Sequence, residues 1–290
     1  MTRIVVTGHA SLDHVALLDG VPAPGRTTTI LERPQGAWPR LGGGPAYVAA
    51  ALVAGGMEDV FPISWVGDDE DGREYRRQLL AAGIPDTGLA VVAGARTPAA
   101  ILAYVPAGGC ICLYDPGMAQ DIVLTPPQRA LVREAGIACL TIGPPSVTEE
   151  VMDLLAPSAL LVWIVKHDPR SLSRKLAARI AGRADFILYS ESEANLVRAA
   201  IEDGDKREDQ TLIRTRGGKG ATLVRGRISE TVSTEPLDVN DPTGAGDSFA
   251  GGVVAAIAKG ETDSAALIRS GHRAAAAMLR RRRANETESA

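Results

Sequence analysis

The chain has 290 residues, of which 31 are Lys or Arg and 35 are Asp or Glu, so that its formal net charge is −4. This balance argues against a protein that binds nucleic acid or an anionic membrane, because such proteins normally carry a basic face or stripe. Hydrophobic residues make up 45% and charged residues 23% of the chain, which excludes wholesale disorder and leaves a globular protein of one or two domains.

Short runs of β-branched and aliphatic residues alternate along the chain with longer, Ala-rich amphipathic stretches. The short runs predict buried strands and the long ones predict helices. In chain order the predicted elements are a strand at 4–8, a helix at 46–54, a strand at 60–66, a helix at 71–82, a strand at 138–142, a helix at 146–155, a strand at 160–165, a helix at 171–181, a strand at 186–189, a helix at 191–202, strands at 211–215 and 221–224, and helices at 246–258 and 264–281. This alternation is typical of a mainly parallel sheet with helices on both faces.

Two stretches interrupt the alternation. Residues 14–41 hold four prolines and no helical period, and residues 86–118 contain short strands such as Leu89–Val92 and Ala99–Val105. Both suit strands that project from the main sheet as a small lid, and lids commonly cover reacting substrates. We therefore expect one domain over residues 1–284, with lid segments at about 14–41 and 86–118, and a disordered tail over residues 285–290.

The cysteines and the apolar runs indicate a compartment. Cys110, Cys112 and Cys139 are odd in number and form no C-x-x-C pair, which predicts free thiols rather than disulfides or a zinc site. No apolar run reaches the 18 or so residues of a membrane helix, and the N-terminus does not resemble a signal peptide. We expect a cytoplasmic protein with neither membrane nor nucleic acid as a partner.

The stretch Asp241–Gly252 is the most informative in the chain. It is a Gly-rich loop that leads into a helix, and the small residues Gly244, Ala245 and Gly246 let successive backbone N–H groups point into one concavity. The helix N-terminus adds a partial positive charge, which suits a phosphate. Asp247 would repel that phosphate, and its presence makes sense if the carboxylate accepts the proton of an attacking hydroxyl, as in phosphoryl transfer to an alcohol.

An ordinary helix N-terminus is the alternative, because an Asp near a helix start and Gly-rich loops are both common. Other phosphate motifs are missing. Gly218-Lys219 is followed by Gly220 rather than by Ser or Thr, and no G-x-G-x-x-G occurs. Neither a P-loop enzyme nor a Rossmann dehydrogenase is therefore supported.

The sequence resembles the PfkB, or ribokinase-like, carbohydrate kinases through five motifs in the family's order. Asp241–Phe249 resembles the carboxyl-terminal signature D-[TP]-T-G-A-G-D-x-F. The other resemblances are Gly8–His14 to the opening strand and its substrate aspartate, Gly42–Gly56 to the amino-terminal G-G-x-x-x-N-x-A signature, Val66–Gly72 to V-G-D-D-x-x-G, and Thr215–Ala221 to the T-x-G-x-x-G-A nucleotide loop. The resemblance implies a three-layer α/β/α fold with a mainly parallel central sheet and a small β-sheet lid.

The resemblance also implies ATP-dependent phosphorylation of a hydroxyl on a sugar or sugar-like molecule. Asp247 would be the base, and the amides of Gly244, Ala245 and Gly246 would form the anion hole. The expected acceptor-binding residues are Ser11, Asp13, Gly43, Gly44 and Tyr47. Tyr47 stands where the family usually has an Asn, which leaves the choice of acceptor open. Without the family, Asp13 would be interpreted as an Asx turn after the first strand.

On the nucleotide side the residues implied by the resemblance are Ser190, Thr215, Gly217, Gly220 and His272. Ser190 and His272 each replace an Asn of the family. By itself the loop from Thr215 to Gly220 equally suits a plain β-hairpin turn, and His272 equally suits a surface position.

Two ions are implied as well. Glu193 would hold Mg²⁺ through water, although a first-turn carboxylate favoured by the helix dipole is the alternative. Asp241 and Thr243 match positions that support a monovalent cation such as K⁺ in some members. Arg280–Arg283 replace a Gly of the family near that site, so the dependence on K⁺ is open, and a cationic helix C-terminus is the simpler interpretation.

Three functions remain under consideration. The first is a sugar kinase, and the second is a nucleoside kinase of the same family, for which Tyr47 or Trp38 could border a base. The third is a non-catalytic nucleotide or sugar sensor, which the intact Asp247 argues against. The resemblance also implies a homodimer through the lid, whose exposed sheet edges would otherwise be a liability.

Overall fold

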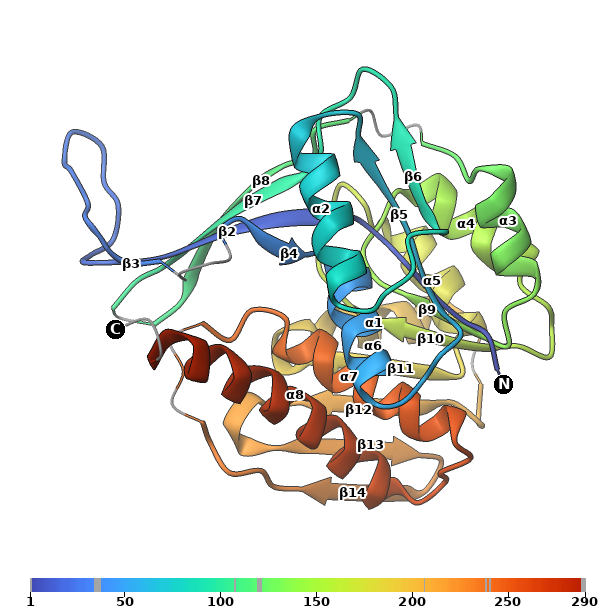
Figure 1. Ribbon diagram of the computed structural model, residues 1–290. Coiled ribbons are helices and arrows are strands. Elements are labelled where there is room, and N and C mark those ends of the chain that lie inside the picture. Colours follow the sequence, from blue (N-terminus) through green and yellow to red (C-terminus); the bar gives the residue numbers. More distant parts are fainter. Residues whose placement is uncertain are drawn as a thin grey trace.

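The computed structural model describes residues 2–33, 38–106, 108–118, 122–205, 207–237, 239 and 241–287, with side chains described up to residue 283. Its centre is a nine-stranded sheet in the order β14-β13-β12-β11-β10-β9-β1-β5-β6 (Figure 1). The strands are β1 (Ile4–Thr7), β5 (Val60–Gly67), β6 (Leu89–Val92), β9 (Ile137–Leu140), β10 (Leu160–Ile164), β11 (Phe186–Ser190), β12 (Thr211–Thr215), β13 (Ala221–Arg225) and β14 (Ile228–Val232). Neighbours from β12 to β6 are parallel, whereas β13 and β14 are antiparallel, which confirms the mainly parallel sheet.

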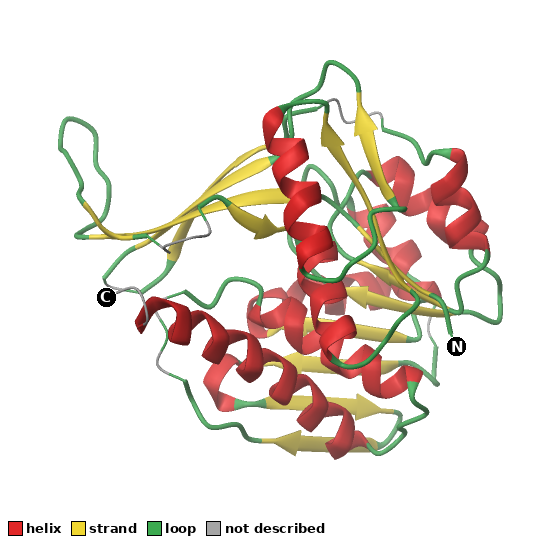
Figure 2. Cartoon of the chain, viewed as in Figure 1, coloured by secondary structure: helices red, strands yellow, loops and turns green. Residues whose placement is uncertain are grey.

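Helices cover both faces of this sheet, as the alternation of the sequence predicts (Figure 2). Successive residues of a strand point to opposite faces, so Ile4 and Val6 join the core under α1, α2, α7 and α8, while Val5 joins the core under α3–α6. The helices are α1 (Gly44–Ala54), α2 (Glu70–Ala81), α3 (Pro126–Arg133), α4 (Pro145–Leu154), α5 (Arg174–Arg183), α6 (Ala194–Asp203), α7 (Ala245–Ala258) and α8 (Ser264–Thr287), with 3₁₀ turns at Glu191–Glu193 and Gly217–Lys219.

A separate five-stranded sheet projects from the large one. Its strands are β2 (Ser11–Leu18), β3 (Ile30–Glu32), β4 (Arg40–Gly42), β7 (Ala99–Tyr104) and β8 (Cys110–Asp115). The order is β3-β2-β7-β8, and β4 also pairs with β2. The chain enters this sheet directly from β1, so that the loop after β1 joins the two sheets (Figure 1).

Three expectations need correction. Leu89–Val92 is a strand, but it is β6 and pairs in parallel with β5 in the large sheet, because the β5–α2–β6 crossover returns it to the open edge of β5. Asp13 lies within β2 and not in an Asx turn. The last helix continues beyond Arg281 to Thr287, so residues 285–287 of the expected tail are helical, and 288–290 lie outside the described residues.

Within the described part of the chain, no helix is long and apolar enough to cross a membrane.

Candidate active site

Residues 241–246, the loop that the sequence predicts to bind a phosphate and that is called the phosphate loop below, lie with Asp247 at the carboxyl edge of the parallel strands. Lys166 follows β10, and its ammonium nitrogen lies 3.6 Å from Oδ2 of Asp247 in the first turn of α7. Open parallel sheets bind ligands outside the carboxyl ends of their strands. The helix N-terminus that the sequence singles out therefore faces the edge where a ligand is expected.

The start of α7 offers free backbone donors. Gly244 is the N-cap with φ +78°, a conformation that glycine adopts without strain. The amide of Ala245 donates to the carbonyl of Pro242 at 3.0 Å, so that one of the three expected anion-hole donors is engaged in the turn. The amides of Gly246 and Asp247 have no backbone acceptor among the described residues. They are the donors that the helix N-terminus leaves available to an anion.

Asp247 is buried, and its two carboxylate oxygens differ. Oδ2 faces the Lys166 ammonium, whereas Oδ1 is buried and has no hydrogen-bond partner in the described structure. A buried carboxylate oxygen without a donor is costly and rare. Such an oxygen is suited to accept a proton from a bound hydroxyl.

Lys166 is a site residue that sequence analysis missed. The charge of Asp247 raises the pKa of the Lys166 ammonium, burial opposes the change, and Glu193 adds to the increase. A cation beside Asp247 and within electrostatic reach of Glu193 can stabilise negative charge on a transferring phosphoryl group. Its position in the sequence could have revealed it, because Lys166 ends a buried apolar run that forms β10, and the carboxyl ends of such strands face the ligand-binding edge of the sheet.

Asp13 is held by two protein hydroxyls. Ser11 Oγ donates to Oδ1 and Tyr47 Oη donates to Oδ2, each at 2.8 Å. Burial raises the pKa of the Asp13 carboxyl, although both hydrogen bonds and the charge of Arg40 oppose the change. The structure thus brings together three of the predicted acceptor-binding residues, Ser11, Asp13 and Tyr47.

The other two predicted acceptor-binding residues, Gly43 and Gly44, lie where the start of α1 approaches the loops that follow β1 and β9. A Cβ on Gly43, which has φ +85°, would lie 2.4 Å from the carbonyl oxygen of His9. A Cβ on Gly44 would lie 2.8 Å from the side chain of Thr141. The close approach of α1 to the loops after β1 and β9 therefore requires glycine at both positions.

Tyr47 also connects the acceptor side to the phosphate loop. A Cβ on Gly244 would lie 2.7 Å from the Tyr47 ring, so the ring packs directly on the N-cap of α7. The guanidinium of Arg282 in α8 lies over the same ring, 5.5 Å from its centroid. One side chain therefore contacts Asp13, Gly244 and Arg282.

Two arginines reach Asp241, at the start of the phosphate loop. Arg40 of β4 forms a buried ion pair with Asp241 Oδ2, and Arg282 Nη1 lies 3.5 Å from the same oxygen. Burial alone would raise the pKa of Asp241, but the hydrogen bond and charge of Arg40, with smaller contributions from Thr243 and Arg282, hold it below its usual value. Arg40 was not singled out from the sequence, because it is 201 positions from Asp241 along the chain. The sequence placed Arg280–Arg283 near the possible cation site but assigned Arg282 no contact of its own.

Ser190 and Glu193 form a capping box at the end of β11. The Ser190 amide and hydroxyl both donate to Glu193 Oε2 at 2.8 Å. One carboxylate oxygen thus serves the turn, as the helix-start interpretation predicts, and Oε1 is left to other partners. No cluster of three or more His, Cys, Asp or Glu that could hold a metal occurs in the described ranges. A Mg²⁺ ion that keeps its waters and binds phosphates needs only one or two carboxylates, which fits Glu193.

The remaining nucleotide-side residues lie on two elements. Thr215 ends β12, and Gly217 and Gly220, at φ +54° and +94°, form the turn to the antiparallel β13, as a hairpin requires. His272 lies in α8, where its ring packs on Phe249 of α7 with centroids 5.4 Å apart and burial lowers its pKa.

The small sheet contacts the phosphate loop directly. The Tyr104 hydroxyl of β7 is hydrogen-bonded to the Thr243 hydroxyl, and the Tyr114 ring of β8 lies 6.1 Å from the His9 ring. The Trp38 ring lies near the small sheet. Its centroid is 5.2 Å from that of the His14 ring of β2 and 4.6 Å from the guanidinium carbon of Arg33, just after β3.

Comparison with known proteins identifies the family. The model of the pfkB family carbohydrate kinases matches residues 1–290. The chain belongs to the pfkB family. This membership agrees with the five motifs and with the arrangement of Asp247 and the free amides at the start of α7.

Individual relatives and structures agree with this assignment. The pfkB-family chain is 27% identical over 261 residues to the ATP-dependent ribose-1-phosphate kinase of Halopiger xanaduensis, covering 88% of this chain and 84% of that protein. It is 25% identical over 265 residues to a nucleoside kinase of Methanothermobacter thermautotrophicus, covering 89% and 83%. The crystal structure of Methanocaldococcus jannaschii nucleoside kinase, a ribokinase-family member, superposes with a TM-score of 0.79 at 21% identity and covers 97% of this chain and 92% of that one. The ribokinase-like fold is thereby confirmed.

Proposed function

We propose that this pfkB-family kinase transfers the γ-phosphoryl group of ATP to a hydroxyl of a sugar or sugar-like molecule, with Asp247 as the base. The observation that carries the proposal is the buried, unpartnered Oδ1 of Asp247 beside the free amides of Gly246 and Asp247. A sensor would have no use for an unpartnered carboxylate oxygen at this position, because its desolvation is costly.

Each group of the site has a chemical role in this proposal. Asp247 Oδ1 takes the proton of the acceptor hydroxyl as its oxygen forms a bond to the γ-phosphorus, and the bond to the leaving ADP oxygen breaks. The free amides of α7 and the Lys166 ammonium stabilise the charge on the transferring group. The Asp13 carboxylate orients the acceptor by accepting hydrogen bonds from the hydroxyl groups of that acceptor.

Magnesium fits the nucleotide side. Mg²⁺, when bound, neutralises charge on the β- and γ-phosphates, and Glu193 would hold it through water. A related fold has been solved as a putative ribokinase II of E. coli in complex with ATP and Mg²⁺. The residues Ser190, Thr215, Gly217, Gly220 and His272 are proposed to line the nucleotide.

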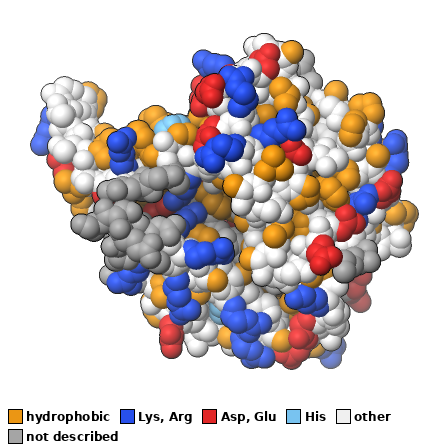
Figure 3. Space-filling view, in the orientation of Figure 1, with side chains coloured by type: hydrophobic (Ala, Val, Ile, Leu, Met, Phe, Trp, Pro, Cys, Tyr) orange, Lys and Arg blue, Asp and Glu red, His pale blue; other side chains and the backbone are white. Residues whose placement is uncertain are grey.

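The small sheet is proposed to act as a lid and as a dimer interface. The Tyr104–Thr243 contact supports the lid, because it links β7 to the phosphate loop. Paired hydrophobic residues on the sheet, Ile101 and Leu113, are 50% and 60% exposed, and Figure 3 shows hydrophobic side chains along this arm. Such a patch on an open sheet favours a homodimer. The exposed, unpaired Cys110 and Cys112 suit a reducing compartment such as the cytoplasm.

A nucleoside kinase is the second candidate, because nucleoside kinases occur both among the sequence relatives and among the structures of like fold. A screen for ATP consumption with ribose 1-phosphate, ribose, fructose and a set of nucleosides separates the two candidates.

The same assay tests the base. We expect Asp247→Asn to lower kcat by at least about 10³-fold, a large effect for loss of a base within a preorganised site. Binding of ATP, measured by calorimetry, should stay within about threefold of the wild type. Turnover of Asp247→Asn near the wild-type rate would refute the assignment.

A further inference from the structure

The loop that precedes the phosphate-binding amides is held by fixed positive charges. Asp241 Oδ1 accepts the Thr243 amide at 3.0 Å, and its Oδ2 faces the guanidinium groups of both Arg40 and Arg282. Arg282 Nη1 also donates to the backbone carbonyl of Thr243. The side chains of Asp241 and Arg40 are 6% and 10% exposed, and that of Arg282 is 20% exposed, so these contacts are largely shielded from solvent.

This set of groups does not fit a monovalent metal ion at Asp241 and Thr243. Such an ion would need carboxylate or carbonyl oxygens as ligands, and both Asp241 oxygens and the Thr243 carbonyl already accept N–H groups. The two guanidinium groups would also repel a third cation at short range. The arrangement observed therefore argues against K⁺ at these two residues, a question that the sequence left open.

We propose that Arg282 is a positioning residue that supplies this loop with its cation, so that phosphoryl transfer is independent of K⁺. The inference rests on the proposed kinase function. Arg282 ties Thr243, immediately before the N-cap Gly244, to α8, and this keeps the following amides aimed at the phosphoryl group. Arginine suits the task, because its planar guanidinium serves a carbonyl and a carboxylate at once.

Arg282 also links the loop to the acceptor side. Its guanidinium lies over the Tyr47 ring, which packs on Gly244 and whose hydroxyl binds Asp13. The end of α8 thereby contacts both halves of the site. Arg40 approaches Asp241 from β4 of the small sheet, so the two arginines join α8 and the small sheet to the same carboxylate.

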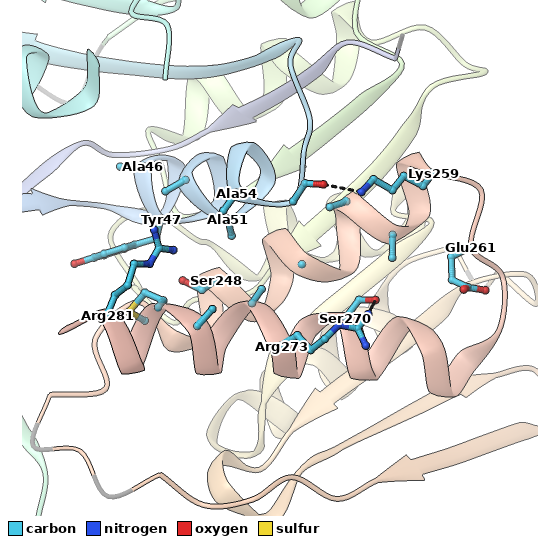
Figure 4. A pocket seen from close by; sticks show the side chains of 18 of the residues that line it. Ala46, Tyr47, Ala51, Ala54, Ser248, Lys259, Glu261, Ser270, Arg273 and Arg281 are labelled. Atoms are coloured by element: carbon cyan, nitrogen blue, oxygen red, sulfur yellow. Dashed lines mark hydrogen bonds between the residues drawn. The ribbon is translucent and has the colours of Figure 1, made fainter. Parts of the chain in front are cut away.

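The surroundings of Arg282 allow a sharp test. Arg282 borders an open cavity of about 870 Å³ between α1, α7 and α8, with small residues such as Ala51 and Ala54 on its walls (Figure 4). A guanidinium ion from solution can reach the space that Arg282→Ala would open. Arg280, which is exposed on the same helix, provides a matched control.

The first experiment measures wild-type kcat in chloride salts of K⁺, Na⁺, NH₄⁺ and choline at equal ionic strength. We expect values within about twofold of one another. Activation by K⁺ of tenfold or more over choline would overturn the proposal.

The second experiment compares Arg282→Ala, Arg282→Lys and Arg280→Ala. We expect Arg282→Ala to lower kcat at least tenfold, with a smaller change in the KM for ATP. Guanidinium or K⁺ added at tens of millimolar should restore at least a third of the lost kcat. Arg282→Lys should retain more activity, and Arg280→Ala should match the wild type. An Arg282→Ala variant that no cation restores, with Arg282→Lys equally impaired, would show a merely structural role and overturn the proposal.

A third measurement needs no turnover. We expect the melting temperature of the free wild-type protein to be the same in KCl and choline chloride, and that of Arg282→Ala to rise in KCl or with guanidinium. A wild-type melting temperature that K⁺ raises by several degrees over choline would contradict the proposal. Failure of the kinase function itself would appear differently, as no ATP turnover by the wild type with any acceptor.

Discussion

The Tyr47 hydroxyl donates a 2.8 Å hydrogen bond to Oδ2 of Asp13, the oxygen that Ser11 leaves free. The buried carboxylate is thus satisfied on both sides before any acceptor binds. An acceptor hydroxyl must share or replace the Tyr47 contact, so Tyr47 bears directly on which molecules the site accepts.

Loss of this hydrogen bond should be measurable. We expect Tyr47→Phe to lower the free energy of unfolding by about 1–3 kcal/mol, because a buried charged oxygen loses its donor. Urea unfolding at pH 7.5 measures the change, and the acceptor KM should change more than the KM for ATP. Tyr114→Phe is the control, since the Tyr114 hydroxyl has no hydrogen bond to a described residue. Equal stability of the two variants would contradict the expected role of Tyr47.

Asp13 should make the protein more stable as the pH falls. Its pKa is raised in the folded state, so the folded protein binds a proton more readily than the unfolded chain, and this stabilising contribution is lost as the pH rises through the raised pKa. We expect Asp13→Asn to raise the melting temperature at pH 7.5, with a gain that shrinks toward the ordinary Asp pKa of about 3.9. Asp71→Asn, at an exposed carboxylate, should show no such gain, and a gain in Asp13→Asn that is independent of pH would count against the explanation.

Lys166 should contribute to the chemical step. We expect Lys166→Met to lower kcat by about 10- to 100-fold with little change in protein stability, because the positive charge next to Asp247 and the phosphoryl group is lost. Steady-state kinetics with saturating ATP measures this effect. Lys175→Met, at an exposed lysine on α5, is the control, and unchanged turnover in Lys166→Met would remove Lys166 from the site.

The N-cap of α7 allows a paired glycine test. Gly244→Ala should destabilise the protein by about 1–3 kcal/mol and reduce turnover, because φ is +78° and a Cβ would meet the Tyr47 ring at 2.7 Å. Gly246→Ala should be tolerated, since a Cβ there would have no neighbour within 4 Å. Chemical unfolding measures the free energy of unfolding of both variants. An equal loss of stability in the two would show that the positive φ of Gly244 and its contact with Tyr47 do not require glycine there.

The sequence by itself was sufficient for most of the large sheet, most of its helices and the glycine-rich turn that begins α7. Each of these depends on residues close together in the chain, such as the alternation around β1 and the spacing of Gly244, Gly246 and Asp247. Periodicity and turn chemistry act over a few residues, so they can be recognised without knowing the fold. The helix α3, the edge strand β14 and the place of Leu89–Val92 escaped this approach, because strand pairing and short helices depend on the neighbours they pack against.

Tertiary structure alone decided how the site is charged and held. Arg40 and Asp241 are 201 positions apart, and Lys166 and Asp247, or Arg282 and Asp241, meet only because β4, β10, α7 and α8 converge at one edge of the sheet. Burial makes these encounters matter, because a shielded carboxylate needs a cation or donor wherever the chain can bring one. The sequence therefore located the glycine-rich turn and the aspartate at the start of α7, whereas the packing of distant elements determined which side chains neutralise, position and surround them.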